Sequence, residues 1–133
     1  MRIMIDANVI YSALYSPNSI IANMVEFIKQ HHTLVLCQYV LDEADAAFKE
    51  KRPTLHESFL LRLYRLPEEI YNLTDIDTEK YPKIRDFKDI PVIAHVIESQ
   101  VDIFITGDKD FDEVNITKPQ IMKPRQFIDA YIK

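Results

Sequence analysis

Short apolar runs alternate with longer stretches of helical periodicity along the whole chain. The runs at residues 2–5, 33–37 and 102–106 are largely hydrophobic without alternation, as in strands that are buried on both faces. A chain in which strands and helices alternate places its strands in a parallel sheet and its helices on the two faces of that sheet. The pattern therefore predicts an α/β fold with a mostly parallel central sheet.

Helical periodicity and proline positions define the remaining elements. After a first amphipathic stretch that Pro17 interrupts, helices are expected at residues 19–28, 40–51, 54–66, 86–98 and 124–132, with a helical turn at 109–113 and brief strands at 70–73 and 121–122. The helix at 54–66 is expected to bury a stripe formed by Leu55, Phe59, Leu60, Leu63 and Leu66. A length of 133 residues with 47% hydrophobic composition fits one compact domain over residues 1–133.

The composition excludes several classes of protein. Gly107 is the only glycine, so the chain has neither a P-loop nor a GxGxxG turn for a nucleotide cofactor. A net charge of -5 argues against nucleic-acid binding by bulk electrostatics alone, although acids at a metal site are masked when a cation is bound. Cys37 is the only cysteine, which excludes an intramolecular disulfide and favours a cytoplasmic location. No run approaches about 18 apolar residues, so no membrane association is expected.

Four carboxylates stand where such a sheet would bring them together. Asp6 follows the first strand, and Asp108 follows the strand at residues 102–106. Glu43 and Asp89 lie near the starts of two expected helices. The carboxyl ends of the strands meet at one edge of an open α/β sheet, so acids that are distant in sequence can converge there. Because converging carboxylates repel one another unless a cation neutralises them, the four acids predict a Mg²⁺ or Mn²⁺ site.

Each acid also has a plain structural explanation, which for Asp108 is the Gly-Asp pair that a tight turn after a buried strand often carries. Asp6 and Asn8 are good helix-capping residues, and Asn8 is expected to hold the turn that orients Asp6. Glu43, taken alone, is more readily explained as a solvated glutamate on a helix surface. Asp89 ends an Asp86-x-x-Asp89 arrangement that resembles a capping box, so Asp86 stays open as the ligand in its place.

The segment around Asp108 and a group of basic residues complete the candidates. Asp110 is a reserve ligand beside Asp108, and the Thr106 hydroxyl is positioned to meet a water or a phosphate. The basic residues best placed to contact a phosphodiester are Lys83, Arg85, Lys88 and Lys109. A solvated surface is the alternative explanation for these four. The histidines lack metal-ligand spacing, and most Tyr and Phe residues fall at helical spacing and are expected in the core.

The segments that carry these acids resemble a known family. Residues Ile5–Ile10, Val40–Glu43, Asp86–Ala94 and Ile105–Phe111 are similar to the acidic motifs of the PIN domain, and within it to those of the single-domain VapC-like toxin ribonucleases. The resemblance covers essentially the whole chain in order. Pro124–Phe127 is similar to the segment that begins the last helix of the family.

The resemblance has consequences for fold, site and activity. It implies a three-layer α/β/α sandwich in which Asp6, Glu43, Asp89 and Asp108 bind Mg²⁺ or Mn²⁺ and serve as the catalytic acids. It implies hydrolysis of phosphodiester bonds in single-stranded RNA. Where the gene is one of a toxin-antitoxin pair, it also implies neutralisation by a small antitoxin protein.

The chain departs from the family pattern at two positions, and neither removes an acid. Ala7 stands where the family often has Thr. Cys37 stands where Ser or Thr commonly opens the glutamate-bearing helix, so this helix is expected to be less well capped.

Several alternatives stay open. The leading one is a non-catalytic PIN-like module that binds RNA or protein and whose acids are structural. A phosphatase with an aspartyl nucleophile is disfavoured, because Asn8 stands where that class has the second aspartate that serves as its general acid. DNA in place of RNA as the substrate, and assembly into a homodimer, are also open.

Overall fold

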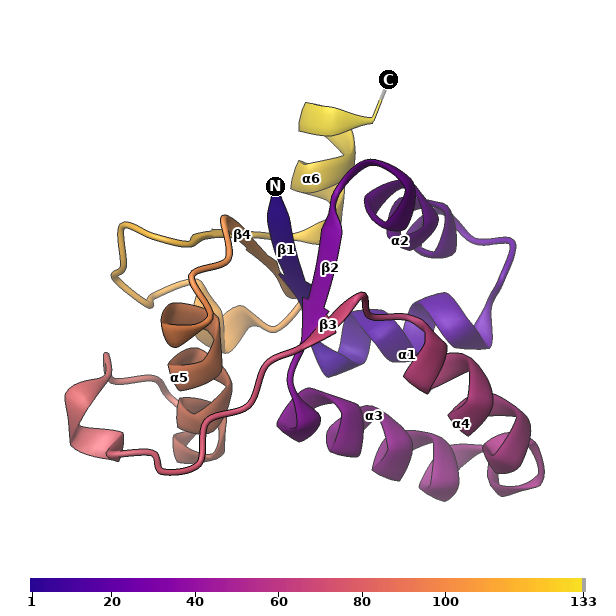
Figure 1. The fold of residues 1–133 in the computed structure, drawn as a ribbon, viewed down its shortest axis with the longest axis horizontal. Coiled ribbons are helices and arrows are strands. Elements are labelled where there is room, and N and C mark those ends of the chain that lie inside the picture. Colours follow the sequence, from indigo (N-terminus) through magenta and orange to yellow (C-terminus); the bar gives the residue numbers. More distant parts are fainter. Residues whose placement is uncertain (133) are drawn as a thin grey trace.

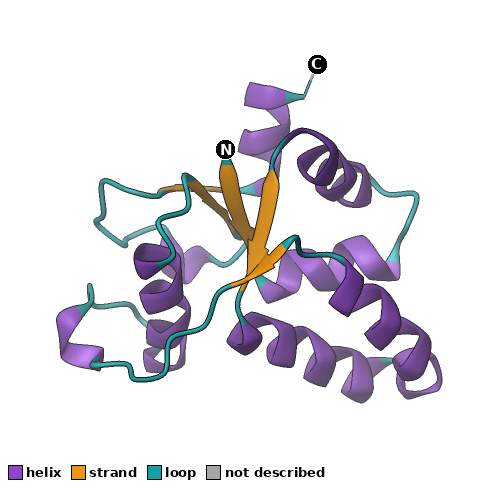
Figure 2. Ribbon diagram, in the orientation of Figure 1, coloured by secondary structure: helices purple, strands orange, loops and turns teal. Residues whose placement is uncertain are grey.

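The computed structural model describes residues 1–132. Over these residues the strands are β1 (Arg2–Ile5), β2 (Thr33–Leu36), β3 (Glu69–Ile70), β4 (Ile103–Ile105) and β5 (Gln120–Met122). The α-helices are α1 (Ala7–Tyr15), α2 (Ile20–His31), α3 (Gln38–Lys51), α4 (His56–Arg65), α5 (Ile90–Glu98) and α6 (Pro124–Tyr131). Figures 1 and 2 show these elements arranged about a central sheet. The predicted alternation of strands and helices is confirmed.

The sheet is parallel throughout its described strands. Its spatial order is β3-β2-β1-β4-β5, and each neighbouring pair is parallel. Ile3 of the central strand β1 pairs with Leu34 of β2 on one side and with Ile103 of β4 on the other. The chain moves outward from β1 to β2 and β3 and then returns to β4, so the strand order reverses between β1 and β4. Such a reversal opens a crevice at the carboxyl ends of the two strands, where α/β proteins bind ligands.

Helices cover both faces of the sheet. The crossovers from β1 to β2 and from β2 to β3 run in one direction, and right-handed crossovers place their helices, α1 to α4, on one face. The crossover from β3 to β4 runs back across the sheet and places α5 on the opposite face. Figure 1 shows this separation, with α5 to the left of the strands and α1, α3 and α4 to the right. The structure therefore confirms the three-layer α/β/α sandwich.

The core lies between these layers. Every residue of β4 is buried, as are the last three residues of β1 and of β2. On the α1–α4 face, the Phe48 ring of α3 stacks on the Phe59 ring of α4 with 3.5 Å between centroids. Strands covered on both faces explain why the sequence shows unbroken apolar runs. Within residues 1–132 no helix is long and apolar enough to cross a membrane.

Helix α5 begins later than the sequence pattern predicts. Residues 87–89 form a 3-10 turn, and the α-helix starts only at Ile90. The Asp86 carboxylate accepts a hydrogen bond from the Lys88 N–H at 3.0 Å and thereby closes the turn ahead of the helix. Asp86 is thus a cap of the turn, while Asp89 lies at the start of α5.

Helix α4 also begins later, after a 3-10 turn at Pro53–Leu55. Because Leu55 lies in this turn, outside the helical stripe, it is 50% exposed, whereas Phe59 and Leu63 are buried. The predicted burial of Leu55 is therefore wrong, while that of the stripe's later positions is confirmed at Phe59, Leu63 and Leu66.

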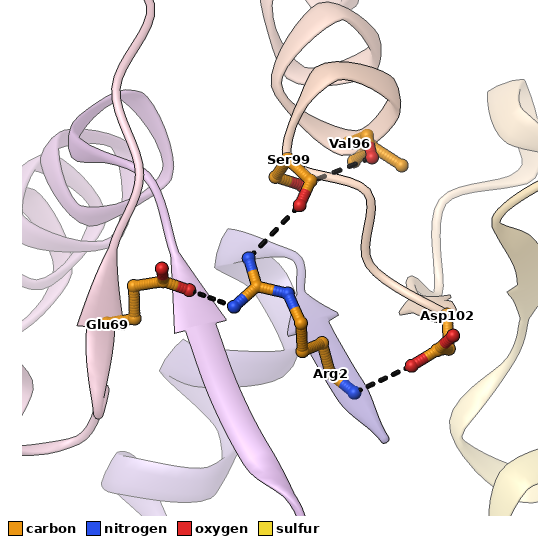
Figure 3. Close-up of polar contacts among 5 residues, drawn as sticks. All are labelled: Arg2, Glu69, Val96, Ser99 and Asp102. Atoms are coloured by element: carbon orange, nitrogen blue, oxygen red, sulfur yellow. Dashed lines mark hydrogen bonds and ion pairs between the residues drawn. The ribbon is translucent and has the colours of Figure 1, made fainter.

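Arg2 joins several elements at the amino ends of the strands, as Figure 3 shows. Its backbone N–H donates to the Asp102 carboxylate at 2.8 Å, and its guanidinium donates to the Ser99 carbonyl at 3.0 Å. The guanidinium also forms an ion pair with Glu69 of β3. One residue thus ties β1 to β3, to the end of α5 and to the segment before β4, at the edge of the sheet opposite to the carboxyl ends.

His95 ties α5 to the segment that follows β3. Its Nδ1 lies 2.7 Å from the Pro91 carbonyl oxygen, and its Nε2 accepts a hydrogen bond from the Leu73 N–H at 3.1 Å. The ring therefore donates from Nδ1 and accepts at Nε2. His95 itself is 4% exposed, and both bonds are partly buried.

Replacing His95 with Ala should lower the free energy of unfolding by roughly 1–3 kcal/mol, because the Leu73 N–H loses its acceptor in a largely buried position. Urea denaturation of both proteins measures the loss. His31→Ala, on the exposed last residue of α2, is the control. Equal losses in the two variants would contradict a specific role of His95 in anchoring the segment after β3.

Candidate acidic site at the carboxyl ends of β1 and β4

Asp6 occupies the crevice between β1 and β4. Its backbone N–H donates to the Ile105 carbonyl at 2.9 Å, which extends the pairing of the two strands by one residue. Its Oδ1 accepts from the Ala7 N–H at 2.8 Å, so Asp6 is the N-cap of α1. Its Oδ2 accepts from the Thr106 hydroxyl at 2.7 Å. The capping role and a place at the strand end therefore coexist in one residue.

Burial makes the charge of Asp6 costly. The side chain is 7% exposed, and loss of water raises the pKa of the carboxyl above its ordinary value. The hydrogen bonds from Thr106 and Ala7 oppose this rise in the pKa, and the charge of Asp108 adds to it. Asp6 is thus held in a fixed orientation while its charge stays poorly compensated.

Thr106 links Asp6 to Asp108. Its hydroxyl donates to Asp6 and accepts a hydrogen bond from the Asp108 N–H at 3.1 Å. The Asp108 Oδ1 in turn accepts from the Asp110 N–H at 2.9 Å and closes a 3-10 turn at residues 109–111. The strand-end acids Asp6 and Asp108 are therefore connected through one buried hydroxyl. The Asn8 amide lies near Gly107, in the same crevice, without a hydrogen bond to Asp6 among the described residues.

Glu43 reaches the same region from α3. Although the residue is exposed, its carboxylate loses part of its hydration and lies close enough to Asp6, Asp89 and Asp108 to be repelled by them. Together these effects raise the pKa of Glu43 from 4.5 to about 7, the loss of hydration being the largest contribution. Repulsion from acids on other elements distinguishes Glu43 from an ordinary surface glutamate.

The start of α3 is capped in an unusual way. Cys37 makes no side-chain capping hydrogen bond, as its departure from Ser or Thr leads one to expect. The Asn72 side chain, from the segment after β3, instead accepts a hydrogen bond from the Gln38 N–H at 2.8 Å.

Asp89 lies close to Asp86 and Asp110, which the sequence suggested only as alternative ligands. One carboxylate oxygen from each of Asp86, Asp89 and Asp110 lies within 4.8 Å of the others. Loss of hydration, followed by the charges of Asp108 and Asp6, raises the pKa of Asp89 to about 6. No described residue donates a hydrogen bond to the Asp89 carboxylate, so its oxygens are free for another partner. The acidic group is therefore larger than the four residues first selected.

Tyr39 is a residue of this site that the sequence analysis missed. Its hydroxyl donates to the Lys88 carbonyl at 3.0 Å and so ties α3 to the turn that precedes Asp89. Loss of hydration and the charges of Glu43 and Asp89 raise the pKa of Tyr39. Tyr39 precedes Glu43 by four residues and therefore shares its helix face, which is the signal that could have identified it.

The basic candidates, which are close to the acids in sequence, do not neutralise them. Lys83, Arg85, Lys88 and Lys109 are exposed, and none forms an ion pair within the described part of the chain. Within residues 1–132 no ion pair therefore compensates the charge of these acids. Carboxylate oxygens with excess negative charge are the donors that hard divalent cations such as Mg²⁺ and Mn²⁺ prefer.

A sequence profile of the PIN domain matches residues 2–110, which include every acid of the site. The chain belongs to the PIN domain family. A comparison with solved structures matches a chain in the crystal structure of VapBC2 from Rickettsia felis bound to a DNA fragment from their promoter, at a TM-score of 0.69 and 18% identity. The match covers 92% of this PIN domain protein and 97% of that chain. A comparison with curated protein sequences found no match.

The titration of Glu43 should make the stability of this PIN domain depend on pH. In EDTA, the folded protein holds a proton on Glu43 up to a pH of about 7, whereas the unfolded chain releases it near 4.5. The stability that this bound proton gives the folded state is fully present below the pKa of the unfolded chain and is lost as the pH rises through 7. The free energy of unfolding from urea denaturation should therefore fall between about pH 5 and about pH 8.

Glu43→Gln removes this titration, so the free energy of unfolding should fall less steeply with pH. Asp42→Asn, at the adjacent exposed position of α3, is the matched control and should keep the wild-type slope. Part of the slope should remain in Glu43→Gln, because Asp89 also has a raised pKa. An unchanged slope in Glu43→Gln would show that the pKa of Glu43 is not raised in the folded protein.

Proposed function

We propose that this chain is a metal-dependent endoribonuclease formed by a single PIN domain over residues 1–133, and that it is the VapC-like toxin of a toxin-antitoxin pair. The observation that carries the proposal is the convergence of acids from four separate segments at the crevice between β1 and β4. Membership of the PIN domain family supports a nuclease, and the uncompensated charge of the acids supports a metal cofactor.

The residues present fit a Mg²⁺ or Mn²⁺ ion. Asp6, Glu43, Asp89 and Asp108 are the proposed metal-binding and catalytic acids. Asp86 and Asp110 provide further oxygens close to Asp89. All the donors are carboxylate oxygens, which hard cations prefer. The oxygens of Asp89 accept no hydrogen bond from a described residue and are therefore available to a cation.

The chain's own residues supply orientation, charge and a proton acceptor. Thr106 and the Ala7 N–H fix both oxygens of Asp6, so that this carboxylate does not need to reorganise when the site is loaded. The Asn8 amide lies beside Gly107 next to the strand-end acids, whereas the buried Thr106 hydroxyl is engaged by Asp6 and the Asp108 N–H and therefore holds the acids in place rather than meeting a substrate. A divalent cation supplies Lewis-acid activation of the phosphodiester and lowers the pKa of water. One of the carboxylates accepts the proton of the attacking water, and none acts as a covalent nucleophile.

Substrate contacts are assigned to the basic residues beside the acids. Lys83, Arg85, Lys88 and Lys109 are proposed to contact the RNA backbone, because they are exposed and free of ion pairs within residues 1–132. Phosphate contacts of this kind position a nucleic acid without reading its sequence.

The proposed partners follow from the same family. The matched structure is of VapBC2 with promoter DNA, and by analogy we assign this chain a small antitoxin partner and a cytoplasmic location. A homodimer is the proposed assembly. A non-catalytic PIN module that binds RNA or protein is the second candidate, favoured only by the ordinary capping roles of Asp6 and Asp108.

Purified protein should cleave single-stranded RNA with Mg²⁺ or Mn²⁺ and not with excess EDTA, and Asp6→Asn should reduce the rate by at least about 100-fold, since it removes a charge at the centre of the site. Cleavage of labelled RNA resolved on denaturing gels measures the rate. Asn retains the cap of α1, so the fold should persist. A DNA strand of the same sequence tests the substrate class.

Asp42→Asn is the matched control, because it removes an equal charge next to Glu43 on the exposed face of α3. Its rate should stay within about twofold of wild type. Strong cleavage by the wild type in EDTA would contradict metal dependence. A folded wild-type protein that binds RNA but never cleaves it would favour the non-catalytic module.

Thermal melts with Asp89→Asn test the metal site independently of activity. Wild type should gain about 2.7 kcal/mol of stability at a Mn²⁺ concentration 100-fold above its dissociation constant, because the cation binds only the folded state. Asp89→Asn should be as stable as wild type or more stable in EDTA, since it relieves repulsion and breaks no hydrogen bond of a described residue. Its gain in Mn²⁺ should be smaller; an equal gain would exclude Asp89 as a ligand.

A further inference from the structure

The 3-10 turn at Phe87–Asp89 presents an aromatic ring to solvent beside the acidic site. The Phe87 side chain is 68% exposed, although helical spacing predicted that the aromatic residues lie mainly in the core. Its sequence neighbour Asp86, together with Asp89 two residues later, belongs to the acidic cluster. A single exposed ring is common on protein surfaces, so its significance depends on what lies around it.

The backbone on both sides of this ring is held by hydrogen bonds. The Asp86 carboxylate accepts from the Lys88 N–H at 3.0 Å, and the Asp89 N–H donates to the Asp86 carbonyl at 2.9 Å. The Tyr39 hydroxyl donates to the Lys88 carbonyl at 3.0 Å and anchors the turn to α3. Phe87 is therefore preorganised, and a ligand that stacks on it loses little free energy in ordering the turn.

A cavity of about 730 Å³ lies against the ring. Its apolar walls come from Phe87, Tyr81, Ile84 and Ile90, and the rest of the lining is Thr78 and the oppositely charged Lys83 and Glu79. The Tyr81 hydroxyl donates to Glu98 at 3.3 Å, which anchors this ring to α5. The volume lies within the range of about 300–1,000 Å³ for sites of small ligands. Flat aromatic walls and a nearby cation suit a planar ring attached to a phosphate.

The charges around the cavity favour a nucleic acid over an apolar peptide. Lys83, Arg85 and Lys88 flank Phe87 on both sides, all are exposed, and none has an ion-pair partner in the described part of the chain. Three free cations beside an aromatic ring complement the phosphates of a single strand whose bases can stack.

We propose that Phe87 is a stacking platform for a nucleobase of single-stranded RNA, and that the cavity beside it receives the base adjacent to the phosphodiester bound at the acidic site. This inference rests on the proposed ribonuclease function. Stacking on an aromatic side chain is tolerant of base identity, so the platform positions the strand more than it selects a sequence.

A double-mutant cycle between protein and ligand tests the platform. The protein carries Asp6→Asn so that RNA stays intact, and the ligands are a short fluorescein-labelled RNA of mixed sequence and an abasic ribose-phosphate strand of the same length. Phe87→Ala should weaken RNA binding by about 5- to 100-fold in fluorescence anisotropy and leave the affinity for the abasic strand unchanged. Phe87→Trp, which keeps an aromatic ring at this position, should bind RNA as the Phe87 parent does.

Leu61→Ala is the matched control. Leu61 is 64% exposed on α4, and its substitution removes a similar apolar surface outside the acidic site. It should leave both affinities unchanged, and all variants should melt as their parent does. Equal weakening of both ligands by Phe87→Ala would overturn the platform. Unchanged RNA affinity would also overturn it and favour a protein segment in the cavity.

The outcomes separate this inference from the proposed function. If wild type cleaves RNA with metal while Phe87→Ala binds RNA as its parent does, only the platform is overturned. If wild type neither binds nor cleaves RNA, the proposed function and the platform are overturned together.

Discussion

The parallel pairing of β1 with β4 is the constraint on which the rest of the structure depends. The connections that follow β1 and β4 lead toward opposite edges of the sheet, so the two strands lie side by side where the strand order reverses. The pairing continues past the strands through the hydrogen bond from the Asp6 N–H to the Ile105 carbonyl. The Thr106 hydroxyl then spans the gap between Asp6 and Asp108. A shift of this register by one residue would turn Asp6 or Thr106 away from the crevice, because successive side chains point to opposite faces.

The acids of the crevice are in an unfavourable electrostatic arrangement that the fold sustains. Loss of hydration, with mutual repulsion added to it, raises the pKa values of Asp6, Glu43 and Asp89. Within residues 1–132 no Lys or Arg side chain forms an ion pair with these acids. Such strain persists when the surrounding structure over-determines the site, and it is common where charge is needed for binding or chemistry. The proposed cation converts this repulsion into binding free energy.

The sequence predicted the parts of the molecule that depend on local pattern. The buried strands are continuous apolar runs, and Asp6 and Asp108 were placed together because strand ends converge in a parallel sheet. The Thr106 hydroxyl was expected to meet a water or a phosphate, and it instead bonds Asp6 and the Asp108 N–H. Asp86 and Asp110 were ranked below Asp89 and Asp108, because their proximity depends on the path of residues 71–89, which has no periodicity to predict. Tyr39 was missed since its partner, the Lys88 carbonyl, lies on that path. Leu55 was misplaced because propensity does not reveal where a 3-10 turn gives way to a helix.

The acids are carried by two separate parts of the fold. Asp6 and Asp108 are fixed to the sheet through backbone and hydroxyl hydrogen bonds. Asp86 and Asp89 sit on a short turn that a single phenol joins to α3. The sheet-borne pair and the turn-borne pair are therefore held independently, so loss of the Tyr39 hydroxyl would disturb the position of Asp86 and Asp89 without moving Asp6 and Asp108.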